Sequence, residues 1–238
     1  MIVTLAERDI RLVLLDIEGT TTPIAFVHDV LFPFVRSHLA SWLELSTGSP
    51  ERARLEQSLA AERAVEQVSF GSLPPSLAGF IEWLMDRDRK SPALKELQGL
   101  IWEQGYRAGA LHGQVYADVP LAMRRWRDAG IGVAIYSSGS ELAQRRLFAS
   151  TSAGDLTPLI VGFFDTVVGA KREASSYVRI ASALGQPPDR LLFVSDVTAE
   201  LGAARTSGCR VALAVRPGNA PQNDAGSYDQ ITTFDEIQ

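Results

Sequence analysis

The stretch Leu12-Val13-Leu14-Leu15-Asp16-Ile17-Glu18-Gly19-Thr20-Thr21-Thr22-Pro23 decides the fold of this chain. Four apolar residues lead directly into an acid, and a second acid, a glycine and three hydroxyl side chains follow. A short apolar run bounded by turn residues is typical of a strand buried inside a parallel sheet. Because ligands bind where the strands of such sheets end, the stretch places two carboxylates where an α/β protein carries its chemistry.

Similar apolar runs recur later in the chain, and amphipathic helical patterns alternate with them. The runs cover residues 132–136, 191–194 and 211–215, with a weaker one at 166–168, and the helical patterns cover 121–129, 141–149, 175–184 and 199–207. Gly130, Gly185 and Gly208 stand where helix C-caps are expected. This alternation predicts an α/β fold with a doubly wound, Rossmann-like parallel sheet.

The segment between the first two apolar runs has a different pattern. Residues 24–119 contain no convincing strand, and amphipathic helices are expected at 30–45, 51–65, 77–87 and 94–108. We therefore expect an α/β catalytic core made of residues 1–24 and 120–238, and an all-helical cap domain, residues 25–119, inserted after the first strand. Ligand sites favour interfaces between such domains.

The composition excludes several classes of function. The chain has 238 residues, 46% of them hydrophobic, and a net charge of −5. Such a charge argues against nucleic acid or an anionic membrane as a partner, and no apolar run approaches the roughly 20 residues of a membrane span. The sole cysteine, Cys209, and the lack of a signal-peptide pattern indicate a cytoplasmic protein.

A second pair of acids follows the run at 191–195. Asp196 stands at the expected strand end, and Glu200 comes four residues later, on the same face of a helix if one begins there. An N-cap aspartate with a first-turn glutamate would have the same spacing. Since Mg²⁺ prefers oxygen ligands, we assign Asp16, the backbone carbonyl of Glu18, and Asp196 as its ligands, with Glu200 outside the ligand set.

Two further features fit a phosphate group. Ser137, Ser138 and Gly139 follow the second strand and open a helix, where hydroxyl and free N–H groups form an anion site. Lys171 is one of only three lysines among 23 basic residues. A compact ammonium group there would balance the charge of a nucleophile and a phosphate.

Together these pieces resemble the haloacid dehalogenase-like hydrolases, which carry the same four motifs in this order. The resemblance implies that Asp16 attacks phosphorus and forms an aspartyl-phosphate, while Glu18 protonates the leaving oxygen and then activates water. Most relatives with two acids have aspartate at both positions, so Glu18 is a departure from the usual pattern.

The chain is also similar to the enolase-phosphatases (acireductone synthases) of methionine salvage. The similarity lies in Glu18 with the three threonines and Pro23, in the stretches 86–90 and 97–102, and in 136–140, 195–201 and 216–219. It implies that 2,3-diketo-5-methylthiopentyl 1-phosphate is first enolised and then hydrolysed to acireductone and phosphate. It further implies one Mg²⁺ per subunit, and we expect substrate contacts from Thr20, Ser137, Ser138, Gly139, Lys171 and Lys90. We expect a monomer, although no sequence pattern gives the oligomeric state. A role of Glu18 in the enolisation is a further hypothesis, motivated by its replacement of the usual aspartate.

The sequence leaves three alternatives open. One is a phosphatase or phosphomutase that acts on a sugar phosphate or another small molecule. The second is a dehalogenase, which is disfavoured because carbon–halogen displacement does not require Glu18. The third is a catalytically silent phosphate-binding protein, against which the complete set of Asp16, Glu18, Lys171 and Asp196 argues.

Overall fold

The computed structural model describes residues 2–87, 89 and 91–238. The chain divides into two compact units, one made of Met1–Val27 with His112–Gln238 and the other of His28–Leu111. The first unit holds the strands β1 (Leu12–Leu15), β2 (Gly132–Tyr136), β3 (Gly162–Phe164), β4 (Leu191–Ser195), β5 (Arg210–Ala214) and β6 (Gln230–Ile231). Its longer helices are α6 (Asp118–Asp128), α7 (Glu141–Ala149), α8 (Ala174–Ala183) and α9 (Thr198–Thr206), and the short α1 (Ile24–Phe26) leads into a π-helical turn at Val27–Leu31.

The strands form one parallel sheet in the order β3-β2-β1-β4-β5-β6. The predicted α/β fold with a doubly wound parallel sheet is thus confirmed. All four residues of β1 are buried, as expected for a central strand. Leu15 pairs with Ile135 of β2 and with Val194 of β4, so the segments that follow these three strands emerge at the same edge of the sheet.

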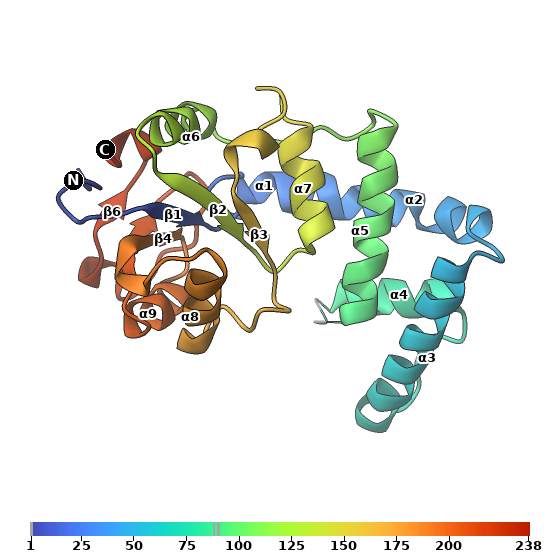
Figure 1. Ribbon diagram of the computed structural model, residues 1–238. Helices are drawn as coiled ribbons and strands as arrows, with labels where there is room; N and C mark the ends of the chain where they lie inside the picture. Colours follow the sequence, from blue (N-terminus) through green and yellow to red (C-terminus); the bar gives the residue numbers. More distant parts are fainter. Residues whose placement is uncertain (1, 88, 90) are drawn as a thin grey trace. The chain divides into compact units, whose positions relative to one another are not determined.

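Helices cover both faces of this sheet (Figure 1). Tyr177 and Ile180 of α8 and Leu201 of α9 pack with Leu14 and Phe193 in one buried cluster, while α6 lies over the opposite face and buries Trp126. Each such side chain contributes about 1.5–3 kcal/mol through burial.

The third strand differs from its prediction. Residues 166–168 form a turn, and the strand β3 covers Gly162–Phe164 instead. The side chain of Asp165 accepts a hydrogen bond from the amide of Val167 at 2.8 Å, which is the geometry of an Asx turn. Val167 is 91% exposed. Local turn chemistry therefore overrides the β-propensity of Thr166, Val167 and Val168.

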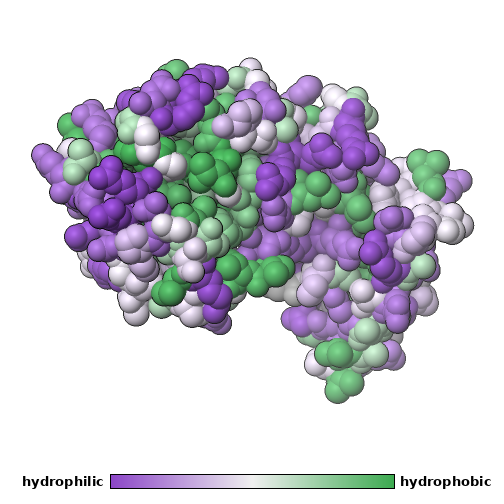
Figure 2. Space-filling view, in the orientation of Figure 1, coloured by the Kyte–Doolittle hydropathy of each residue, from purple (hydrophilic) through white to green (hydrophobic). Residues whose placement is uncertain are grey.

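All regular secondary structure in the described residues of the second unit is helical. It contains α2 (Phe32–Leu45), α3 (Pro50–Phe70), α4 (Leu77–Asp86) and α5 (Pro92–Arg107). Ser49, Ser76 and Ser91 each accept a backbone amide as N-caps of α3, α4 and α5. Figure 2 shows apolar surface at the end of α3, where Val65, Val68 and Phe70 are exposed. No helix in the described part of the chain is long and apolar enough to span a membrane.

Candidate active site

Asp16 stands directly after β1, and neighbouring groups hold its carboxylate from two sides. The residue is 4% exposed, and its amide still pairs with the carbonyl of Val194 at 3.0 Å. Oδ1 accepts a hydrogen bond from the amide of Ile17 at 2.7 Å. Oδ2 lies 3.0 Å from Ser195 Oγ and 2.7 Å from Lys171 Nζ. The end of the central strand thus presents an oriented, paired carboxylate.

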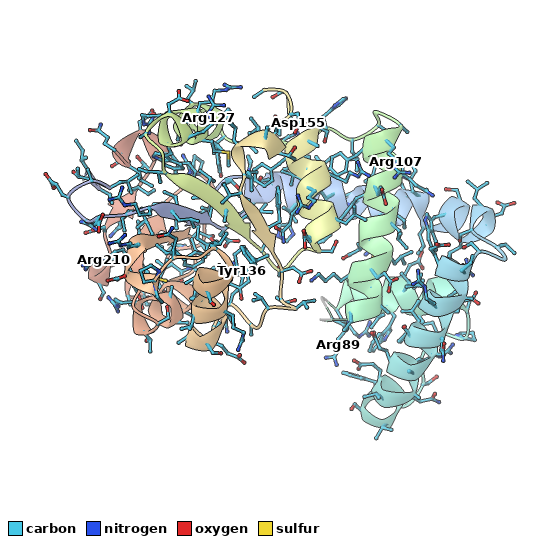
Figure 3. All side chains as sticks on the ribbon, viewed as in Figure 1. Arg89, Arg107, Arg127, Tyr136, Asp155 and Arg210 are labelled. Atoms are coloured by element: carbon cyan, nitrogen blue, oxygen red, sulfur yellow. The ribbon has the colours of Figure 1, made fainter. Side chains whose placement is uncertain are left out.

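Lys171 is shared between two carboxylates. Its Nζ lies 2.6 Å from Glu200 Oε2 as well as next to Asp16, and its side chain is only 9% exposed. Nζ also lies 5.9 Å from the centre of the Tyr136 ring, which Figure 3 labels at the end of β2. The backbone around Lys171 is fixed by Tyr177, whose hydroxyl donates to the Lys171 carbonyl at 2.7 Å.

The site holds more negative than positive charge. Burial lowers the pKa of Lys171, but the charges of Asp16 and Glu200 outweigh burial, so the pKa of Lys171 is raised. Burial, followed by the charge of Asp16, raises the pKa of Glu200. The same two causes raise the pKa of Asp196 to about 7. A further cation bound here would therefore be stabilised by charge that Lys171 leaves unbalanced.

The loop after Asp16 turns tightly, and we call residues 16–22 the acid loop. The amides of Thr20, Thr21 and Thr22 all donate to the carbonyl of Ile17 at 2.9–3.1 Å. Gly19 adopts φ +69°, and a side chain at Gly19 would collide with the carboxyl of Asp196, whose Cγ lies 2.7 Å from the Cβ position. The turn therefore requires glycine, and it brings the acid loop against Asp196.

The structure brings some of the predicted site residues together. Asp16 and Lys171 are in direct contact, and the acid loop, which carries the half-buried Glu18, lies against Asp196. Thr20 is fully buried, and its backbone amide donates a hydrogen bond to the carbonyl of Ile17. A contact between Thr20 and the substrate therefore stays a prediction. Lys90 lies outside the described residues.

The predicted phosphate-binding turn follows β2, the neighbour of β1. Ser138 is exposed, and Ser137 Oγ accepts the amide of Gly139 at 3.3 Å. Among the described residues, no hydrogen bond joins this turn to Asp16. Buried Gln144 holds the turn in place because its Nε2 donates to the carbonyls of Gly139 and Phe164 at 2.9 and 2.8 Å.

The donor set bears on the kind of metal that would fit. Within residues 2–87, 89 and 91–238, no three His, Cys, Asp or Glu side chains are grouped to hold a metal by themselves. The predicted set uses two carboxylates and one backbone carbonyl, with water to complete it. Mg²⁺ is bound in this manner because it keeps several waters and takes only one or two carboxylates.

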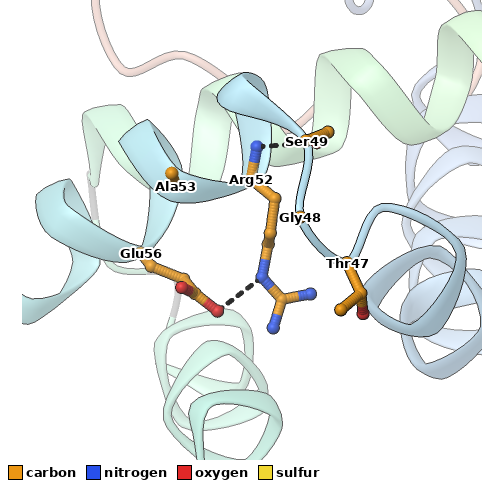
Figure 4. Close-up of a pocket in the computed structure, with 6 residues that line it drawn as sticks. All are labelled: Thr47, Gly48, Ser49, Arg52, Ala53 and Glu56. Carbon is orange, nitrogen blue, oxygen red and sulfur yellow. Dashed lines mark hydrogen bonds and ion pairs between the residues drawn. The ribbon is translucent and has the colours of Figure 1, made fainter.

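A hollow in the helical unit offers no comparable chemistry. Figure 4 shows it at the start of α3, lined by Thr47, Gly48, Ser49, Arg52, Ala53 and Glu56. Arg52 Nε donates to Glu56 Oε1 at 2.7 Å, and its NH1 donates to the carbonyl of Leu43. The charged groups of this hollow are thus already paired with one another.

Sequence reasoning missed two groups that shape the site. Ser195 Oγ lies between Asp16 Oδ2 and Glu200 Oε2, at 3.0 and 3.1 Å, and its position directly before Asp196 was the available signal. Gln144 gave no signal, because one glutamine in a helical pattern is ordinary.

Comparison with known proteins agrees with this geometry. The family model "haloacid dehalogenase-like hydrolase" matches residues 10–208, which places the chain in this class of hydrolases. Enolase-phosphatase E1 of Synechococcus elongatus is 48% identical over 233 residues, which cover 96% of this chain and 98% of the relative. That of Sorangium cellulosum is 48% identical over 230 residues, or 95% and 97% of the two chains.

A solved structure supports the same relationship. The UTR4 protein from Saccharomyces cerevisiae is 34% identical, with a TM-score of 0.76 over 94% of this chain and 98% of that one. The chain belongs to the enolase-phosphatase E1 family of haloacid dehalogenase-like hydrolases, and it is a phosphatase by class.

Proposed function

We propose that this protein is the Mg²⁺-dependent enolase-phosphatase that converts 2,3-diketo-5-methylthiopentyl 1-phosphate to acireductone and phosphate. The observation that carries the proposal is the buried carboxylate of Asp16, held by Lys171 and Ser195 at the end of the central strand. Such a carboxylate is oriented for attack, and Lys171 balances the charge that a phosphate would add.

In the phosphatase half-reaction, Asp16 attacks phosphorus and the bond from phosphorus to the ester oxygen breaks. Glu18 donates a proton to that oxygen, which leaves as the enol hydroxyl of acireductone. Glu18 then takes a proton from water, whose oxygen attacks the aspartyl-phosphate and releases phosphate and free Asp16. Dividing one displacement into two steps is the benefit of the covalent intermediate.

The residues present suit a magnesium ion. Asp16, the backbone carbonyl of Glu18 and Asp196 would hold it. Burial and then the charge of Asp16 raise the pKa of Asp196, and a bound cation would offset both by stabilising its charged form. When bound, Mg²⁺ supplies electrostatic stabilisation of the phosphoryl group. The backbone donors at residues 137–139 and Lys171 would orient the phosphate oxygens.

The enolisation must remove a proton from the carbon that bears the phosphate ester oxygen. Glu18 is the candidate base because its side chain is one methylene longer than the usual aspartate. Glu18→Asp, assayed separately on the diketone and on the preformed enol phosphate, tests this role. An equal loss of both half-reactions contradicts a special role of Glu18 in enolisation.

The proposal is tested by Mg²⁺-dependent turnover of the diketo-phosphate, with ultraviolet absorbance of the enol and released phosphate followed together. Asp16→Asn should abolish phosphate release, and retention of full release contradicts Asp16 as the nucleophile. Phosphate release from sugar phosphates at a higher kcat/KM than from the diketo-phosphate would favour a general phosphatase instead.

Three further expectations belong to this proposal. The helical segment 25–119 serves as a cap that excludes water and binds the methylthio group of the substrate. Lys90, which lies outside the described residues, is expected to contact the polar end of the substrate or a loop of the catalytic core. The protein acts as a cytoplasmic monomer that carries one Mg²⁺.

A further inference from the structure

Donors from outside the acid loop bind three successive carbonyls of that loop. Asn219 Nδ2 donates to the carbonyl of Gly19 at 2.9 Å. Arg216 Nε donates to the carbonyl of Thr20 at 3.2 Å, and the amide of Tyr116 donates to the carbonyl of Thr21 at 3.0 Å. The direction of each peptide plane after Glu18 is thereby fixed by a group far away in the sequence.

The two side-chain donors come from one short turn. In Arg216-Pro217-Gly218-Asn219, the amide of Asn219 donates to the carbonyl of Arg216 at 3.1 Å, and Gly218 has φ +88°. A four-residue turn of this type requires a positive φ at its third residue, which glycine supplies, and it favours proline at the second residue. The turn therefore presents Arg216 and Asn219 to adjacent carbonyls of the acid loop.

Arg216 is a buried charged side chain, and burying a charge does not by itself increase the stability of the folded protein. Its side chain is 3% exposed, and NH2 pairs with Asp118 Oδ2 at 2.7 Å. NH1 donates to the carbonyl of Thr232 at 2.8 Å, and the guanidinium lies 4.5 Å from the centre of the Tyr116 ring. A buried ion pair is often no more stabilising than apolar residues of the same volume, so a role in positioning accounts better for its presence.

Asn219 also lies close to a predicted metal ligand. The position that a Cβ on Gly19 would take is 2.9 Å from Asn219 Oδ1 and 2.7 Å from Asp196 Cγ. Asn219 Oδ1 is buried and has no hydrogen-bond partner among the described residues. The amide group of Asn219 thus flanks the place where the acid loop meets Asp196.

We propose that Arg216 and Asn219 are positioning residues that hold the acid loop so that the Glu18 carbonyl and the carboxylates of Asp16 and Asp196 bind Mg²⁺ together. The expected effect on turnover rests on the proposed function. The expected effects on the order of the acid loop and on Mg²⁺ affinity do not depend on the substrate. Mutation of a residue that hydrogen-bonds to metal-ligating groups and orients them typically lowers metal affinity or activity by about 10–100-fold.

The experiment compares Asn219→Ala and Arg216→Lys with two matched controls. Asn223→Ala changes an exposed asparagine of the same segment. Arg125→Lys changes an arginine that donates to the carbonyls of Phe234 and Ile237 but not to the acid loop. Arg216→Lys keeps the charge opposite Asp118, and Asn219→Ala leaves the ion pair intact, so the two variants perturb the loop by different routes.

Three measurements decide the proposal: hydrogen–deuterium exchange of a peptide that covers residues 16–22, Mg²⁺ affinity by calorimetry without substrate, and steady-state turnover. We expect faster exchange in that peptide, about tenfold weaker Mg²⁺ binding and about tenfold lower kcat with KM nearly unchanged, in both variants and in neither control. Unchanged exchange, or faster exchange with wild-type Mg²⁺ affinity, overturns the proposal. If the wild-type protein does not turn over the diketo-phosphate, the proposed function fails, while exchange and calorimetry still test the positioning role.

Discussion

Replacing Lys171 by methionine removes the ammonium group that Asp16 and Glu200 share, while it keeps a side chain of similar length. The three side chains are 9%, 6% and 13% exposed, so water cannot replace the lost charge. In metal-free protein the carboxyl groups must then either remain charged without a cation beside them or take up a proton. Either outcome lowers the free energy of unfolding of the variant. The loss caused by protonation depends on pH.

The cost can be bounded from ordinary carboxyl chemistry. Keeping one buried carboxyl neutral costs about 1.4 kcal/mol for each pH unit above its usual pKa of about 4.3. The cost of protonating the carboxyl is therefore about 1.6 kcal/mol at pH 5.5 and about 5 kcal/mol at pH 8. If the carboxylate instead stays charged after loss of the ion pair, the cost is about 3–5 kcal/mol at either pH. In the variant, the pKa of this buried carboxyl is higher in the folded state than in the unfolded state. The free energy of unfolding of the variant therefore decreases as the pH rises between the two pKa values.

Urea unfolding of wild type and Lys171→Met, each in EDTA at pH 5.5 and pH 8, measures this effect. We expect the variant to lose about 1–2 kcal/mol at the lower pH and about 3–5 kcal/mol at the higher one. Arg210→Met, which changes an exposed cation of β5, should show no such pH dependence. An equal loss at both pH values would refute the charge-balance argument for Lys171.

Three other predictions follow from the same contacts. Gly19→Ala should destabilise the protein by more than 2 kcal/mol, whereas Gly48→Ala, with φ +80° and open space around it, should cost only about 1 kcal/mol of backbone strain in urea unfolding. Since burial and the charge of Asp16 raise the pKa of Asp196 to about 7, protons should compete with Mg²⁺ below that pH, and the Mg²⁺-induced rise in Tm should be larger at pH 8 than at pH 6. Tyr177→Phe leaves the Lys171 carbonyl without its 2.7 Å donor and should lower stability by about 1–2 kcal/mol in thermal unfolding; an unchanged Tm would contradict this.

The arrangement of the acids could be predicted because it follows from local pattern and sheet geometry. Asp16 and Asp196 each follow an apolar run, and neighbouring parallel strands end at the same edge. Lys171 could be singled out because lysine is rare in this chain, and in the structure its Nζ forms an ion pair with Asp16 at 2.7 Å. Its catalytic role, like those of Glu18 and residues 137–139, remains a prediction.

Other parts of the site depend on contacts that no local pattern encodes. The stretch 166–168 has β-branched residues, yet the side chain of Asp165 turns the chain there. Arg216 and Asn219 meet the acid loop across 196 and 200 residues of sequence. Only the packing of the whole sheet brings these segments together, so their contacts with the acid loop could not be predicted from local sequence patterns.

The position of β1 in the sheet also has a consequence for how the chain folds as it is synthesised. The neighbours of β1 begin at Gly132 and Leu191, so the strand that carries Asp16 is translated long before either partner. Helices of the unit His28–Leu111 can form early from nearby residues, whereas pairing of distant parallel strands is slow. A chain that stalls before Leu191 therefore presents one unpaired edge of an apolar strand, which favours aggregation and makes chaperone binding during synthesis an advantage.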